Sequence, residues 1–177
     1  MRQFTNVLIL GLALSGSLVL AQQTPAKGSN ARATFVTDVN DLEKKLVALA
    51  NAVPQDKFGW RPGAGVRSFS EVYMHTALSN YYFIGALGLK PPAGPSESAE
   101  KTMTQKAQVL DALKTSMTAL RQAVMNLSQA ELGKPLKLEG QQTTNEGALI
   151  IIAGHMHEHL GQLVAYARMN GIAPPWS

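Results

Sequence analysis

The chain has 177 residues, 45% of them hydrophobic, and contains no cysteine. This length fits a single domain with a well-formed core, and the lack of cysteine excludes disulfide bonds, thiol nucleophiles and a lipid-anchored cysteine. The net charge of +4 is small, and the basic residues are scattered along the chain rather than clustered. We therefore expect no nucleic acid partner.

The first 21 residues have the pattern of a secretory signal peptide. Arg2 supplies a small positive region, an apolar run extends from Val7 to Leu20, and the small residue Ala21 follows it. Because the run is shorter than the roughly 20 residues that a membrane-spanning helix needs, a cleaved signal is favoured over an uncleaved anchor. We predict cleavage between Ala21 and Gln22, a periplasmic or secreted protein, and no stable membrane insertion of the mature chain.

The remainder of the chain predicts a flexible leader, residues 22–31, followed by one helical domain, residues 32–177. The leader is polar and contains proline and glycine, whereas apolar residues recur at helical spacing in four later segments. These segments span about residues 33–52, 68–88, 99–126 and 143–170. No segment alternates with period two for long enough to predict a strand. Four amphipathic helices joined by two long connections predict an all-α four-helix bundle.

Two of these helices begin with the sequence pattern of a capping box. Ser68 and Glu71 have the required spacing at the start of the second helix, and Thr143 and Glu146 repeat it at the start of the fourth. Gly171 is expected just past the end of the fourth helix, where the backbone is often left-handed.

Three of the four histidines lie in the fourth predicted helix, at positions 155, 157 and 159. On a helical wheel of about 100° per residue, His155 and His159 share an inward stripe, whereas His157 faces the opposite side. The fourth histidine, His75, lies on the inward side of the second helix. Buried imidazoles need partners, and one divalent metal ion would satisfy all three. A catalytic zinc ion typically has three protein ligands and one open position.

A metal-free interpretation of the same histidines stays open. Two histidines four residues apart on a helix are often surface groups or hydrogen-bonded core groups. The zinc-protease signature is absent, because Gly161 stands where a second histidine would have to follow His157 and Glu158. Glu158 is a candidate for orienting a ligand or acting as a general base, although an exposed helix glutamate is the simpler interpretation.

Three further residues are candidates for positions around the site. Gln162 could accept or donate a hydrogen bond to a ligand imidazole. Tyr82 is nearest to His75 by helical spacing and could line a pocket, although tyrosine on a bundle helix is more often a core residue. Arg61 could act as an anion clamp, or it could brace its loop by stacking on Trp60.

The segment 155–163 (HMHEHLGQL), taken with Tyr166 and the upstream His75, resembles the ligand motifs of the DinB-like superfamily. The resemblance extends over essentially all of the chain after the signal peptide. It implies a four-helix bundle in which His75, His155 and His159 hold a divalent transition metal, most often zinc or nickel. It also implies that His157 occupies a variable position of the motif.

The resemblance leaves the reaction open. Some members of that superfamily are thiol-dependent transferases or isomerases, but the thiols they use are cytosolic, which disfavours that activity for an exported protein. A metal ion that activates water to hydrolyse an unknown small-molecule substrate is the more economical hypothesis. Two alternatives are a non-catalytic metal site that joins two helices and a metal-free interaction module. A homodimer formed through an exposed apolar helix face is also compatible with the sequence.

Overall fold

The computed structural model describes residues 30–177, so the predicted signal peptide and most of the leader lie outside the described residues. The last leader residue, Ala31, already belongs to the first helix. The helices, in chain order, are α1 (Ala31–Ala52), the 3-10 helix η1 (Gln55–Lys57), α2 (Phe69–Ala86), α3 (Ala99–Thr102), α4 (Lys106–Asn126), α5 (Gln129–Leu132) and α6 (Asn145–Met169). Two short strands, β1 (Pro135–Leu138) and β2 (Gln141–Thr144), lie between α5 and α6.

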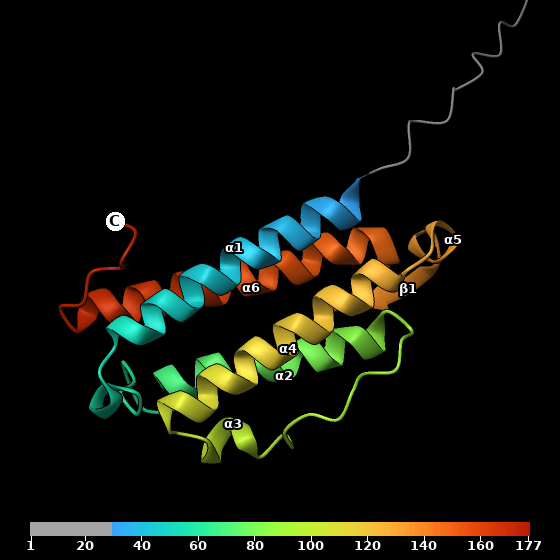
Figure 1. Ribbon diagram of the computed structural model, residues 1–177. Coiled ribbons are helices and arrows are strands. Elements are labelled where there is room, and N and C mark those ends of the chain that lie inside the picture. Colours follow the sequence, from blue (N-terminus) through green and yellow to red (C-terminus); the bar gives the residue numbers. More distant parts are fainter. Residues whose placement is uncertain (1–29) are drawn as a thin grey trace, which may run out of the picture.

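The four long helices form a bundle, as predicted (Figure 1). Helix α1 packs against α4 and α6, and α2 packs against the same two helices, so α1 and α2 face each other across the bundle diagonal. In Figure 1, α1 and α6 run in one direction while α2 and α4 run in the other. Within the described part of the chain, no helix is both long and apolar enough to cross a membrane.

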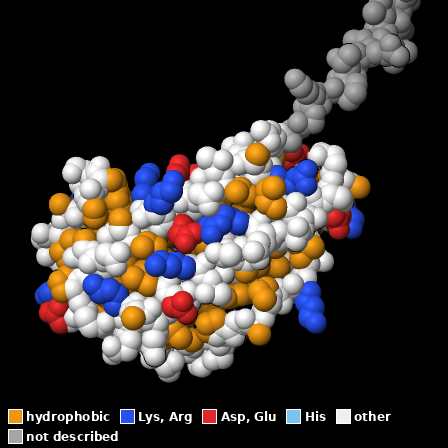
Figure 2. Space-filling view, in the orientation of Figure 1, with side chains coloured by type: hydrophobic (Ala, Val, Ile, Leu, Met, Phe, Trp, Pro, Cys, Tyr) orange, Lys and Arg blue, Asp and Glu red, His pale blue; other side chains and the backbone are white. Residues whose placement is uncertain are grey.

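Helices α1 and α4 bury apolar stripes of the kind that sequence periodicity predicts, whereas α2 is buried on most of its faces. In α1 the buried residues are Phe35, Val39, Leu42, Leu46, Leu49 and Ala50. Burying one leucine or phenylalanine side chain stabilises the fold by about 1.5–3 kcal/mol, so these stripes supply most of the force that assembles the bundle. The face shown in Figure 2 has basic and acidic side chains interspersed with apolar ones.

The third predicted helix is interrupted, which the sequence did not anticipate. Met103 has an extended backbone after α3, and α4 begins only at Lys106. The side chain of Gln55 explains this start, because its Nε2 donates to the Thr104 carbonyl at 3.1 Å and its Oε1 accepts from the Lys106 N–H at 2.7 Å. The connection from α2 to α4 is therefore longer than predicted, and it returns along the bundle so that the two helices are parallel.

A small antiparallel hairpin replaces part of the predicted connection before the last helix. Pro135 pairs with Thr144 at one end of the hairpin. Glu139 and Gly140, with φ of 48° and 78°, form the turn, as in hairpins whose two turn residues are left-handed. Strand β1 alternates leucine with other residues over only four positions, and β2 is polar throughout, so neither has an alternation long enough to predict a strand.

The hairpin also shifts the start of the last helix from the predicted position. Thr143 is part of β2 and pairs with Leu136, so the predicted capping box of Thr143 and Glu146 does not form. Thr144 is the cap instead, and its side chain accepts a hydrogen bond from the Gly147 N–H at 3.2 Å. At the other end, Gly171 has φ of 73°, which confirms the predicted left-handed position.

Candidate metal centre

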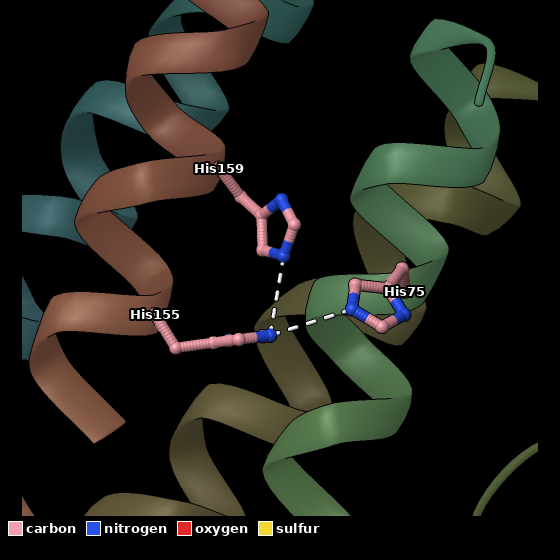
Figure 3. Close-up of side chains that lie close together, drawn as sticks. All are labelled: His75, His155 and His159. Atoms are coloured by element: carbon pink, nitrogen blue, oxygen red, sulfur yellow. Dashed lines mark hydrogen bonds between the residues drawn. The ribbon is translucent and has the colours of Figure 1, made fainter. Parts of the chain in front are cut away.

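The side chains of three histidines converge between α2 and α6 (Figure 3). Nε2 of His155 lies 3.3 Å from Nε2 of His75 and 3.1 Å from Nε2 of His159. Among the residues that the structure describes, these three form the group whose ligand atoms could hold a metal ion. His157 projects from the other side of α6 and contacts Asp38 of α1 at 3.1 Å, as the helical wheel predicts.

The start of α2, two turns before His75, is held by the predicted capping box. Ser68 Oγ accepts from the Glu71 N–H at 3.3 Å, and a Glu71 carboxylate oxygen accepts from the Ser68 N–H at 2.7 Å. Arg61 and Lys101 contact the other carboxylate oxygen at 3.1 and 3.3 Å. Burial by itself raises the pKa of Glu71, but the hydrogen bonds from Ser68, Arg61 and Lys101 outweigh it and lower the pKa overall. The carboxylate therefore stays ionised and keeps the first turn in place.

His75 is oriented by a carboxylate from α3. Its Nδ1 lies 3.2 Å from Oε2 of Glu100, and Nε of Arg67 donates to Oε1 of the same residue at 3.0 Å. Burial raises the pKa of Glu100, but the hydrogen bonds and charges of Arg67 and His75 lower it overall. Because an ionised carboxylate can only accept, Nδ1 of His75 carries the proton. In the neutral ring, Nε2 then presents a lone pair to the other two histidines.

His159 is oriented in the same way from within α6. Its Nδ1 lies 2.9 Å from Oε1 of Gln162, whose Nε2 donates to the Tyr166 hydroxyl at 2.9 Å. Since an amide oxygen only accepts, Nδ1 of His159 is the donor and its Nε2 is left as a lone pair. Tyr166 is itself held by edge contacts with the rings of Trp60 and Phe69, at 5.5 and 5.6 Å between centroids.

The pKa of His155 lies well below its ordinary value. Burial, together with the charges of His159, His75 and Arg67, lowers the pKa of His155 to about 4. Burial and the charges of Arg67 and His159 also lower the pKa of His75, against the opposing effect of Glu100. Both rings are therefore neutral at pH 7, as a metal ligand must be.

The donor set fits a divalent transition metal. Two of the three converging Nε2 atoms, those of His75 and His159, are unprotonated and present a lone pair. Nε2 of His155 can donate a hydrogen bond to only one of them, so the other would have no donor. A cation satisfies all three nitrogens at once. Two ligands of a tetrahedral ion with metal–nitrogen distances of about 2.0–2.1 Å lie roughly 3.3 Å apart, and His155 Nε2 lies 3.3 and 3.1 Å from the other two Nε2 atoms. The ligand atoms of all three histidines lie within 4.8 Å of one another.

The structure brings one of the four residues predicted around the site into contact with a histidine. Gln162 holds His159. Tyr82 is 58% exposed, and the ring that lies against His155 is that of Phe83, one position further along α2. Glu158 is exposed on α6. Within residues 30–177, no hydrogen bond or ion pair joins Tyr82 or Glu158 to a histidine of the cluster, and Glu158 has the exposed position of the simpler interpretation.

Arg61 is a loop brace rather than an anion clamp at the histidines. Its guanidinium donates to the Val66 carbonyl at 3.0 Å and contacts Glu71 at 3.1 Å. The predicted partner, Trp60, packs instead against Phe69 and Tyr166. The bracing role is therefore correct, but it is exerted through the capping box of α2.

Sequence analysis did not identify Glu100 and Arg67 as part of the site. Glu100 lies in a segment predicted as the start of a long helix, and no spacing relates it to His75. Arg67 directly precedes the capping residue Ser68, so its position at the start of α2 could have been inferred. The ion pair that it makes with Glu100 depends on where α3 packs.

Comparison with known proteins identifies the family of this chain and proteins that share its fold. The model of the DinB superfamily matches residues 40–163. No curated protein matches the sequence. Among solved structures, a DinB-like protein from Bacillus cereus ATCC 10987 is 17% identical with a TM-score of 0.68, covering 80% of this chain and 93% of that one.

Two structures from Bacillus subtilis are similar in the same way. The DinB-like protein YjoA is 18% identical with a TM-score of 0.60, covering 78% of this chain and 92% of that one. YfiT, described as a probable metal-dependent hydrolase with an unusual four-helix bundle topology, is 16% identical with a TM-score of 0.63, covering 86% and 93%. At these identities the structures establish a common fold. The family model covers most of the sequence, and the chain therefore belongs to the DinB superfamily.

Proposed function

We propose that this protein is a metal-dependent hydrolase in which His75, His155 and His159 hold a divalent transition metal, with zinc and nickel as the leading candidates. The observation that carries the proposal is the convergence of three Nε2 atoms, two of which are held as lone pairs by Glu100 and Gln162. The description of YfiT as a probable metal-dependent hydrolase supports the same activity for a protein of the same fold.

The surroundings of the histidines suit a catalytic rather than a closed metal site. A metal ion held by His75, His155 and His159 would leave a position open for water, and it would supply the Lewis acidity that activates water and polarises a substrate carbonyl or phosphoryl oxygen. Within residues 30–177, no fourth His, Cys, Asp or Glu joins the group. The His75 side chain is 24% exposed, so the edge of the cluster is in contact with solvent.

The division of labour among the protein groups follows from their contacts. Glu100 and Gln162 each keep a proton on Nδ1 of their histidine and hold the ring in one orientation. Such outer hydrogen bonds fix the tautomer and raise the basicity of a metal ligand. Burial keeps His155 and His75 neutral.

Export is a second part of the proposal. It is supported by the charged start, the apolar run and the small residue at position 21 that mark a signal peptide. A periplasmic or secreted protein would meet its substrate outside the cytosol. Cytosolic thiols would not be available to it, which supports hydrolysis over thiol transfer.

The proposal is tested by the metal content of the full-length gene product recovered from the periplasm without chelators. We expect about one equivalent of transition metal by plasma mass spectrometry, and an intact mass that corresponds to a chain starting at Gln22. A variant with His75, His155 and His159 all changed to Ala should lose the metal. His157→Ala is the matched control, because this histidine lies on the same helix but faces Asp38, and it should keep the metal.

A structural role for the metal is the alternative that the geometry also supports, because the site joins α2 to α6. The two roles differ in turnover. The metal-loaded protein and the triple variant should be compared on ester, amide and phosphoester substrates with chromogenic leaving groups. Metal-dependent turnover supports the hydrolase. Full metal occupancy without turnover on any of the three bond types would favour the structural role.

A further inference from the structure

Arg67 extends to the edge of the histidine cluster with most of its hydrogen-bonding capacity unused. It contacts Glu100 through Nε alone, at 3.0 Å, and its side chain is 38% exposed. Within residues 30–177, no acceptor forms a hydrogen bond with its two Nη groups. A guanidinium held by one edge presents the other donors in a planar fork, which matches the oxygens of a carboxylate or phosphate.

The position of Arg67 relative to the histidines is set by Glu100. One carboxylate oxygen contacts Arg67 and the other contacts Nδ1 of His75, so only the Glu100 side chain separates the guanidinium from the proposed metal ligand of α2. Arg67 is therefore joined through Glu100 to the histidine that α2 contributes.

The balance of charge around the cluster leaves an excess of positive charge. Two carboxylates, Glu71 and Glu100, are contacted by three cationic side chains, Arg61, Arg67 and Lys101. A divalent metal on three neutral imidazoles adds two further positive charges. The Glu100 carboxylate lies between Arg67 and His75 and offsets part of this positive charge. An anionic ligand that contacts Arg67 would offset more of it.

Building on the proposed hydrolase, we propose that Arg67 binds an oxyanion of the substrate through its Nη groups. The substrate class is then small molecules that carry a carboxylate or a phosphate near the bond that is hydrolysed. Arg67 is a substrate-binding residue in this scheme, and Glu100 holds it beside His75. Sequence alone pointed to a different arginine, Arg61, whose two Nη groups each donate to a protein acceptor, Val66 and Glu71.

The test uses the zinc-loaded mature protein, that is, the chain after removal of the signal peptide. Two probes, inorganic phosphate and acetate, are titrated into it by calorimetry. The variants are Arg67→Gln, Arg67→Lys and, as the matched control for loss of one positive charge, Arg168→Gln, which lies on the exposed face at the end of α6. Zinc affinity is measured separately for each protein by competition with a chelator. Circular dichroism confirms that each variant is folded.

We expect Arg67→Gln to weaken the binding of one probe by roughly tenfold or more, the loss expected when a charged hydrogen-bond donor is removed. Arg67→Lys should recover part of the affinity, and Arg168→Gln should behave like the wild type. Zinc affinity of Arg67→Gln should be unchanged or higher, because a repelling charge is gone. The larger effect on phosphate or on acetate identifies which oxyanion the substrate carries.

Unchanged affinity for both probes in Arg67→Gln would overturn the inference while leaving the metal site intact. Loss of zinc in Arg67→Gln would also overturn it, because Arg67 would then act only by supporting His75 through Glu100. Failure of the wild type itself to bind zinc or nickel is a different result. It would refute the proposed function, and the inference built on it would fall as well.

Discussion

The protonation states of the three histidines decide what the cluster can bind. His75 and His159 have no freedom of tautomer, because Glu100 and Gln162 accept from their Nδ1 atoms. His155 differs, since its Nδ1 is buried and has no hydrogen-bond partner within residues 30–177. Its neutral state is maintained by burial and by positive neighbours, with a pKa of about 4.

This lowered pKa predicts how the stability of the metal-free protein depends on pH. An unfolded histidine has a pKa of about 6.5, so below that value the unfolded chain binds protons that folded His155 and His75 do not. The free energy of unfolding should be constant above about pH 6.5 and fall as the pH approaches 5, by roughly 1–2 kcal/mol after allowance for solvent screening. Urea unfolding at pH 7.5, 6 and 5 measures this.

The control separates the histidines from the acidic groups. Glu71 and Glu100 have lowered pKa values, so their contribution is lost only below about pH 4.5 and does not affect this window. His155→Gln should flatten the pH dependence between 6.5 and 5, whereas His157→Gln should leave it as in the wild type. Equal slopes in the wild type and His155→Gln would contradict the assignment.

At the scale of secondary structure, side-chain contacts join the first turn of α2 to the loop that precedes it and to the short helix α3. Glu71 completes the capping box and also receives Arg61 and Lys101, while Glu100, next to Lys101 in α3, receives His75. The short α3 is therefore attached to α2 by two neighbouring charged side chains. A substitution that loosens the start of α2 should therefore also alter the position of His75, which lies two turns further along the helix.

Ser68→Ala removes the cap of α2 and tests this connection. We expect a loss of about 1 kcal/mol in the free energy of unfolding and a severalfold weaker zinc affinity, because the turn that leads to His75 loosens. Ser128→Ala is the matched control, since Ser128 forms the same capping box with Glu131 at the start of α5, outside the histidine cluster. That variant should retain the zinc affinity of the wild type. Equal zinc affinities in both variants would show that the cap of α2 does not support the site.

Over the whole molecule, the histidines lie at a weakly packed boundary of the bundle. Helix α2 packs most extensively against α4, and α6 against α1, whereas the direct contact between α2 and α6 is smaller. The three histidines occupy this contact. A bound metal would therefore join the two halves of the bundle that Figure 1 shows side by side.

Metal binding should consequently stabilise the fold. At a free zinc concentration of about 100 times the dissociation constant, the free energy of unfolding should rise by about 2.7 kcal/mol, because the unfolded chain lacks the preformed site. Thermal melts with zinc, and again after a chelator is added, measure the rise and its reversal. The His157→Ala variant should respond like the wild type, and the variant lacking His75, His155 and His159 should not respond. A rise of the same size in that triple variant would place the zinc elsewhere.

Properties that repeat along one helix could be predicted from the sequence. Helical periodicity predicted the four long helices. The four-residue spacing of His155 and His159 predicted that they share one face of α6, and that His157 lies on another. The capping box of α2 was also correct, because its residues are three positions apart in the chain. These features depend on neighbours within one or two turns, so the local sequence is sufficient to determine them.

Only the tertiary structure decided the features that join distant segments. The break before α4 depends on a cap from Gln55, and the orientation of His75 depends on Glu100 from α3. Arg67 becomes part of the site only because α3 places Glu100 next to it. Hydrogen bonds and ion pairs of this kind follow from how the packed helices bring remote side chains within about 3 Å of one another. Because these residues are far apart in the sequence, no periodic pattern along the chain predicts that they lie within that distance.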